Sequence, residues 1–240
     1  MLHHLVRKNQ EYWNHERSLI ALLTYMCLAV LCWISLGDYS TSWWAFGIGD
    51  ILFNLIILAG VFAVFTEWRR QFTFILIAMF AGIFQIVSFF IGSTLWLVLS
   101  YSFSILFLIL LAKQVIKRIF KDGPMNFYRI QGSIIIFLII GVVYAMLYAV
   151  LEAIHPGSLA VAGAPEENSS GFSQVLYFSF VTMTTMGIGD MIPVSPFAKS
   201  LVVFQGIVGL LYPVIMIARL VSLEVTHSAH LKRQGGSNTS

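Results

Sequence analysis

Charged residues are scarce in this sequence of 240 residues: Asp, Glu, Lys and Arg make up only 10% of it, against about 25% in an ordinary soluble domain. Cysteine is almost absent, and Cys27 and Cys32 lie in one apolar run, which provides no disulfide framework. Every histidine falls outside the apolar runs, which contain no Ser/His/Asp set and no cluster spaced for a metal. These absences exclude a soluble enzyme, a disordered chain and a nucleic-acid-binding domain.

Apolar residues, by contrast, are abundant: 58% of the chain is hydrophobic, and its mean hydropathy is +0.85. A helix needs about 20 apolar residues to cross a bilayer, and the apolar runs provide roughly six such segments. We therefore expect an all-α membrane protein with six transmembrane helices, at 18–36, 45–65, 72–91, 95–112, 130–151 and 198–223. Only Gly92, Ser93 and Thr94 separate the third span from the fourth, which predicts a tight antiparallel hairpin.

The distribution of Lys and Arg predicts the orientation of these spans. With the N-terminus inside the cell, every Lys and Arg except Lys199 lies on the cytoplasmic side. The acidic residues of the external side are Asp38, Asp50, Glu152, Glu166, Glu167 and Asp190. We therefore expect a multi-pass protein of the cell membrane with both termini in the cytoplasm.

The spans divide the chain into a cytoplasmic N-terminus, a four-helix domain, a cytoplasmic linker, a two-span domain and a cytoplasmic tail. The predicted boundaries are 1–17, 18–112, 113–129, 130–223 and 224–240. The linker begins with alternating cations and apolar residues from Lys113 to Lys121. This composition fits a short helix in the headgroup layer, and it fits a solvated end of the fourth helix equally well.

The segment between the last two spans has the most informative pattern. Residues 172–183 are apolar or hydroxylated but too few to cross a bilayer, which predicts a re-entrant helix. The following segment, 184–190, contains Gly187 and Gly189, which relax the limits on backbone dihedrals. Main-chain carbonyls from Thr185 to Ile188 could then form a ladder of cation ligands. Because one copy cannot enclose an ion, the functional unit is expected to contain four chains.

The run from Ser179 to Pro193, SFVTMTTMGIGDMIP, resembles the pore helix and filter of the tetrameric potassium channels, whose filter usually reads T-x-G-[YF]-G-D. The resemblance covers 130–223 and implies a homotetramer of the six-span type, in a bacterial inner membrane rather than a eukaryotic one. It implies K⁺ as the bound ion, membrane lipids and further copies of the chain as the partners, and no organic cofactor. The implied ion-binding residues are Thr185, Met186, Gly187, Ile188 and Gly189, and the implied supporting residues are Tyr177, Phe178, Thr182, Thr184 and Asp190.

The sequence departs from that family at the filter. Ile188 replaces the usual Tyr or Phe, Tyr177 and Phe178 replace a common pair of Trp, and Val181 replaces a Glu that some relatives have. Ile188 cannot form the hydroxyl-mediated bonds by which Tyr braces a filter. A weakly selective cation channel is therefore one alternative to a K⁺ channel. A secondary transporter with an unwound helix is another, although such folds usually show paired interruptions and this chain has one.

The last span contains residues that suggest a gate. Gly206, Gly209 and Pro213 lie on its inner half, and Pro213 removes a main-chain donor, so that the helix could bend there. Glycines in membrane helices also serve close packing, and the sequence leaves both roles open. Voltage sensing needs several Arg or Lys within the fourth span. None occurs between Leu95 and Ala112, which predicts a channel that is not steeply voltage-gated.

Overall fold

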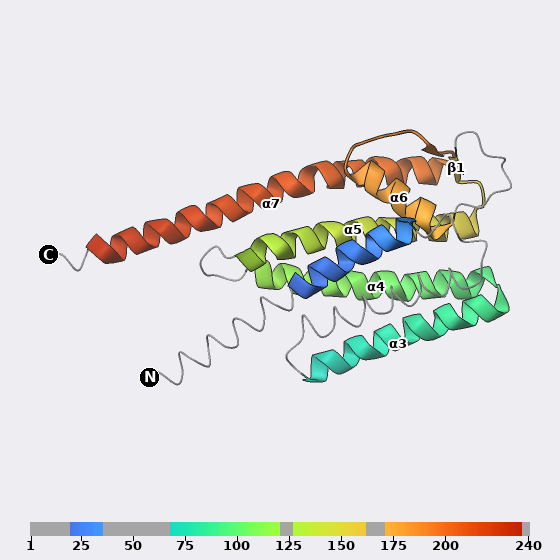
Figure 1. The fold of residues 1–240 in the computed structure, drawn as a ribbon, viewed down its shortest axis with the longest axis horizontal. Coiled ribbons are helices and arrows are strands. Elements are labelled where there is room, and N and C mark those ends of the chain that lie inside the picture. Colours follow the sequence, from blue (N-terminus) through green and yellow to red (C-terminus); the bar gives the residue numbers. More distant parts are fainter. Residues whose placement is uncertain (1–19, 36–67, 121–126, 162–170, 237–240) are drawn as a thin grey trace.

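The computed structural model describes residues 20–35, 68–120, 127–161 and 171–236, and Figure 1 shows the fold. These residues form long helices that lie roughly side by side, with one short helix, α6, near one end. The helices are Ile20–Ser35, α3 (Trp68–Ile91), α4 (Thr94–Ile119), α5 (Phe127–Ile154), α6 (Phe172–Met183) and α7 (Pro196–Gly236). The strands are β1 (Leu159–Val161) and β2 (Met191–Pro193).

Three of the described helices are long and apolar enough to cross a membrane: Thr94–Lys117 in α4, Arg129–Ile154 in α5 and Pro196–Ser222 in α7. They contain the predicted fourth and fifth spans and all but the last residue of the predicted sixth span. The apolar parts of the first and third predicted spans are shorter, at Ile20–Ser35 and Ile75–Val87. The predicted second span, 45–65, lies outside the described residues, so the count of six spans stays a prediction.

The predicted hairpin of the third and fourth spans is present. Gly92 begins the turn between α3 and α4 with a φ of 63°, which is favourable for glycine and costly for other residues. Aromatic rings pack between the two helices, with the Phe84 ring centroid 5.2 Å from that of Phe103 and 5.7 Å from that of Trp96. The two helices therefore form one antiparallel unit.

The C-terminal end of α4 packs against α5. Val115 and Ile119 are buried, and a Cβ built on Gly132 would lie 2.9 Å from the Ile119 side chain, so a larger residue at 132 would require that side chain to shift. Residues 113–119 continue α4 without a break, although the sequence suggested that the linker starts at Lys113. Burial of one apolar face against α5 accounts for this continuation, while Lys113 and Lys117 remain exposed.

The Ile20–Ser35 helix packs on the same core. Leu22, Met26 and Ala29 follow one another at helical spacing and are buried with residues of α4 and α5. Farther along, the Trp33 ring lies 4.6 Å from the Phe172 ring at the start of α6, and Tyr101 of α4 stacks on Phe172 at 5.6 Å. The N-terminal helices thus contact the two-span domain of their own chain.

The helix that contains the sixth predicted span is longer than expected. α7 has 41 residues and does not end at Leu223, the predicted boundary, but continues to Gly236 and projects beyond the other helices in Figure 1. From Val214 to Gln234 the sequence contains neither glycine nor proline, the residues that most disfavour a helix. The helix ends at Gly235 and Gly236, where glycine is the usual terminator.

Candidate functional site

The short helix α6 lies between α5 and α7 and contacts both. Its 12 residues span about 18 Å at 1.5 Å per residue, well below the roughly 30 Å of a hydrocarbon core. Its bounds, Phe172–Met183, are those expected for the re-entrant helix. Half of its residues are buried, namely Val175, Leu176, Phe178, Ser179, Val181 and Met183.

Gly141 allows α6 to approach α5 closely. A Cβ at position 141 would lie 2.6 Å from the Phe180 ring, so a larger residue would push the two helices apart. The same glycine accepts a hydrogen bond at its main-chain oxygen from the Ser179 hydroxyl, at 2.7 Å. α6 is therefore held to α5 by a buried hydrogen bond at the point of closest approach.

The C-terminus of α6 forms a Schellman turn that leads directly into the glycine-containing segment. The Met186 amide donates to the Val181 carbonyl at 3.0 Å, and the Thr185 amide donates to the Thr182 carbonyl at 3.1 Å. Thr185 has a φ of 59°, at the position that glycine usually occupies in this motif. A positive φ is uncommon outside glycine and is found at functional sites when the surroundings enforce it.

Residues 185–189 alternate in the sign of φ. The angle is positive at Thr185, Gly187 (59°) and Gly189 (83°), whereas Met186 and Ile188 are not among the residues with positive φ. All five residues are exposed in the single chain, with Met186 at 71% and Ile188 at 60%. Within the described ranges, no group of His, Cys, Asp and Glu side chains could hold a metal ion. The oxygens available at this site are those of the main chain and of the threonines.

The chain leaves this segment through a short sheet that the sequence did not predict. β2 pairs antiparallel with β1, with Met191 opposite Val161 and Pro193 opposite Leu159. The Glu152 carboxylate supports this sheet, because it accepts hydrogen bonds from the amides of Gly157 at 2.7 Å and Leu159 at 3.1 Å. The end of the segment is thereby tied to the loop that follows α5.

Asp190 lies between Gly189 and β2 and contacts two groups. Its carboxylate accepts a hydrogen bond from its own neighbour, the Met191 amide, at 3.0 Å. The carboxylate also interacts with the Tyr177 side chain of α6. Two of the predicted supporting residues are thus brought together, and the contact links the side of α6 to the end of the segment. Phe178, by contrast, is buried against the edge of the Tyr148 ring of α5 at 5.2 Å.

The predicted hinge residues of α7 have different surroundings. A Cβ on Gly209 would overlap the main-chain oxygen of Met183 and lie 2.9 Å from its carbonyl carbon, so Gly209 packs directly on the end of α6. A Cβ on Gly206 would meet no atom within 4 Å. Pro213 lies inside the helix, one turn after Gly209. Gly209 therefore has the packing role that the sequence left open, and its predicted role as a hinge stays a prediction.

A buried hydrogen-bond network joins the three helices, and the sequence analysis missed all of its side chains. The hydroxyl of Tyr148 on α5 donates to Oε1 of Gln205 on α7 at 2.7 Å. Nε2 of Gln205 donates to the main-chain oxygen of Ser179 at 2.9 Å and to its hydroxyl oxygen at 2.7 Å. One signal was available: Gln205 is a polar residue inside an otherwise apolar run, where a hydrogen-bonded partner is required.

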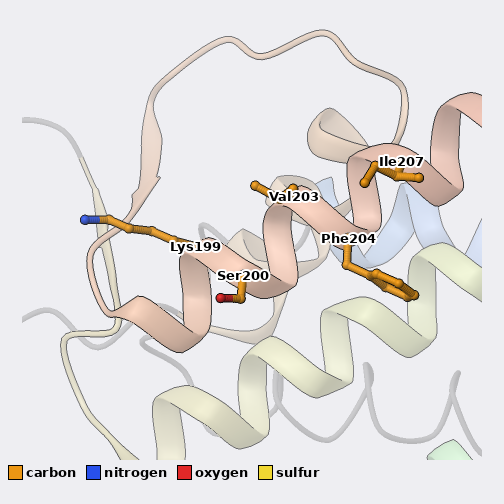
Figure 2. Close-up of a pocket in the computed structure, with 5 residues that line it drawn as sticks. All are labelled: Lys199, Ser200, Val203, Phe204 and Ile207. Carbon is orange, nitrogen blue, oxygen red and sulfur yellow. The ribbon is translucent and has the colours of Figure 1, made fainter.

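The opposite face of α7 is largely uncovered in the single chain. Figure 2 shows an open hollow along this helix that is lined by Lys199, Ser200, Val203, Phe204 and Ile207, with the Lys199 side chain extending away from the apolar ones. Only 11% of the most apolar window of α7 is buried, against 50% for α5. The described residues therefore leave an apolar surface on α7 for lipid or for another chain.

One comparison with known protein families matches this part of the chain. Residues 132–225 match a family described as ion channel, and this range includes most of α5, all of α6 and the filter-like segment, and α7 to Val225. No curated protein matches the chain. The match and the apolar helices support a membrane protein that contains a domain similar to those of ion channels, which favours a channel subunit over an enzyme.

Proposed function

We propose that this protein is one subunit of a homotetrameric potassium channel and that residues 185–189 form its selectivity filter. The observation that supports this most directly is the alternating sign of φ from Thr185 to Gly189. Alternation between the two helical hands directs successive amide groups to one side of the chain and the carbonyls to the other. Carbonyls from four copies, with the Thr185 hydroxyls, would replace the hydration shell of K⁺.

The short helix assists the ion electrostatically. α6 ends at Met183, immediately before the filter, and the C-terminal end of a helix has a partial negative charge. Four such ends around one axis would favour a cation in the water-filled space below the filter. No charged side chain is required for this effect, which suits a domain in which charged residues are few.

Assembly into a tetramer is supported by the uncovered surfaces. One filter segment is exposed along its whole length and cannot enclose an ion by itself. The uncovered face of α7 provides apolar surface beside it, including Val203, Phe204 and Ile207. We propose that further copies of the chain cover part of this surface and that membrane lipids cover the rest.

The gating hinge is proposed to lie on α7 at Gly206, Gly209 and Pro213. Pro213 leaves the carbonyl one turn before it without an amide donor, and Gly206 and Gly209 are the neighbouring small residues. The absence of Lys and Arg from Leu95 to Ala112 supports opening that is not steeply voltage-dependent. The proposed location is the cell membrane, a bacterial inner membrane in particular, with both termini in the cytoplasm.

Ion permeability of reconstituted protein tests this proposal. Bi-ionic reversal potentials should show higher permeability for K⁺ than for Na⁺, and single-channel steps should exceed the turnover of a transporter. Equal permeability would establish the weakly selective channel that Ile188 suggested. Ion flux that saturates at transporter rates, or a protein that stays monomeric by mass photometry, would refute the pore.

A further inference from the structure

Two buried residues of α7 contact α6 in matching register. Gln205 bonds to Ser179, and Gly209 packs on Met183. The two residues of α7 are four positions apart, and so are their two partners on α6. Residues four apart lie on one face of a helix, about 6 Å apart along its axis. The two contacts therefore form a continuous seam over one turn of each helix, and we call these four residues the α6–α7 seam.

The chemistry of Gln205 determines its orientation. The side chain is fully buried, and its amide group has three bonds to two helices: Oε1 accepts from Tyr148, and Nε2 donates to the carbonyl oxygen and the hydroxyl of Ser179. A rotation by 180° would place the oxygen against the Ser179 carbonyl and the NH₂ group against the tyrosine hydroxyl. A buried amide with all of these partners has a strong preference for one arrangement.

The seam ends where the filter begins. Met183 is the last residue of α6, and it lies inside the Schellman turn in which Thr185 and Met186 bond back to Thr182 and Val181. A displacement of α6 along the seam would therefore displace Thr184 and Thr185 by the same amount. The position of Thr185 therefore depends on the same contacts that hold Gln205 and Gly209 of α7 against α6.

We propose that Gln205 is a positioning residue for the filter: its bonds to Ser179 and Tyr148 set the height of α6 against α7 and α5, and hence the spacing of the carbonyls at 185–188. This inference rests on the proposed channel function and deepens it. Ion selectivity is expected to depend on Gln205 although its side chain lies one and a half turns of α6 away from the filter. Loss of the hydrogen bonds of Gln205 should lower the K⁺/Na⁺ selectivity of the channel.

The experiment compares the K⁺/Na⁺ permeability ratio of three variants in reconstituted tetramers. Gln205→Leu removes the seam bonds and leaves the Tyr148 hydroxyl without its acceptor. The double variant Tyr148→Phe/Gln205→Leu removes that hydroxyl too, which should recover stability but not the bonds to Ser179. Tyr212→Phe is the matched control, because the Tyr212 hydroxyl also joins α7 to α5, donating to the Ser133 carbonyl at 2.8 Å, and this bond does not involve α6.

The K⁺/Na⁺ permeability ratio is expected to fall by about fivefold in both Gln205 variants. This factor corresponds to the net free energy that a typical hydrogen bond contributes. Tyr212→Phe should keep the ratio of the wild type even where it lowers the melting temperature. As a second readout, K⁺ should raise the melting temperature of the wild-type tetramer in detergent more than Na⁺ does, since a ligand stabilises the form that binds it. This difference should shrink in both Gln205 variants.

Two results would overturn the inference while leaving the channel intact: recovery of the ratio in the double variant together with its stability, or an equal loss in Tyr212→Phe. In either case Gln205 would act on stability alone. A wild type that neither conducts nor responds to K⁺ in its melting temperature would refute the proposed function, and the inference with it.

Discussion

An alanine at position 209 tests the contact between α7 and the end of α6. Its methyl group would overlap the main-chain oxygen of Met183 and lie 2.9 Å from the carbonyl carbon, where real Cβ atoms essentially never approach. Restoring an ordinary contact requires the two helices to separate by roughly 1 Å. The neighbour is main chain in a hydrogen-bonded helix end, so it cannot rotate away as a side chain could.

The magnitude follows from two opposing terms. Overpacking of this kind costs about 1–3 kcal/mol, whereas replacing glycine by alanine in a helix gains up to about 1 kcal/mol. Gly206→Ala is the matched control, because it lies on the same helix and its methyl group would meet nothing within 4 Å in the single chain. Because both variants gain the same helix propensity, they are expected to differ by the overpacking cost alone, about 1–3 kcal/mol in free energy of unfolding, with Gly209→Ala the less stable.

Melting temperatures in detergent and single-channel recordings provide the measurements. For a chain of this size 1 kcal/mol corresponds to about 2–4 °C, so the two variants should melt at least about 2 °C apart. Gly209→Ala should also change the conductance or the selectivity, because the displaced helix end leads into the filter. Equal melting temperatures for both variants would refute the close contact. A changed open probability with normal stability and selectivity would instead identify Gly209 as a hinge.

Three further substitutions test other parts of the site. Gly187→Ala requires alanine to adopt a left-handed conformation, which costs about 1–2 kcal/mol in each subunit. It should abolish conduction or selectivity while mass photometry still shows a tetramer, and normal selectivity would contradict the filter assignment. Gly141→Ala should lower the melting temperature by crowding the Phe180 ring, and adding Phe180→Leu should recover part of the loss, whereas strictly additive losses would argue against that contact. Tyr177→Phe removes the hydroxyl that interacts with Asp190 and should reduce the K⁺/Na⁺ permeability ratio. An unchanged ratio in bi-ionic recordings would show that this interaction does not support the filter.

Much of the two-span domain could be predicted because its signals are local. The bounds of α6 follow from an apolar run that is too short to span, between a polar stretch and a pair of threonines. Gly187 and Gly189 have the positive φ that their residue type made plausible. The turn at Gly92 is local in the same sense, since it needs only one residue that accepts a left-handed conformation.

Element ends were predicted less well where packing extends a helix. α4 runs past Ala112 because Val115 and Ile119 find an apolar partner surface on α5. α7 runs past Leu223 because nothing in the following residues interrupts it before Gly235. Hydropathy reports where a helix is apolar, and a helix can continue beyond that point.

The amino-acid sequence by itself indicated an apolar, helical membrane protein and gave the bounds of the short helix α6, since both depend on composition or on neighbours along the chain. The orientation that its cations suggest stays a prediction. Only the tertiary structure decided that Gln205 meets Ser179 and Tyr148, that Gly209 faces Met183, and that β1 pairs with β2. Each of these contacts joins residues more than 20 positions apart, and a hydrogen bond between distant residues leaves no periodic pattern in a single sequence. The positive φ of Thr185 is a different case: the turn that holds it is local and closed by bonds to Val181 and Thr182, but threonine rarely adopts this conformation and so gave no sign of it in the sequence.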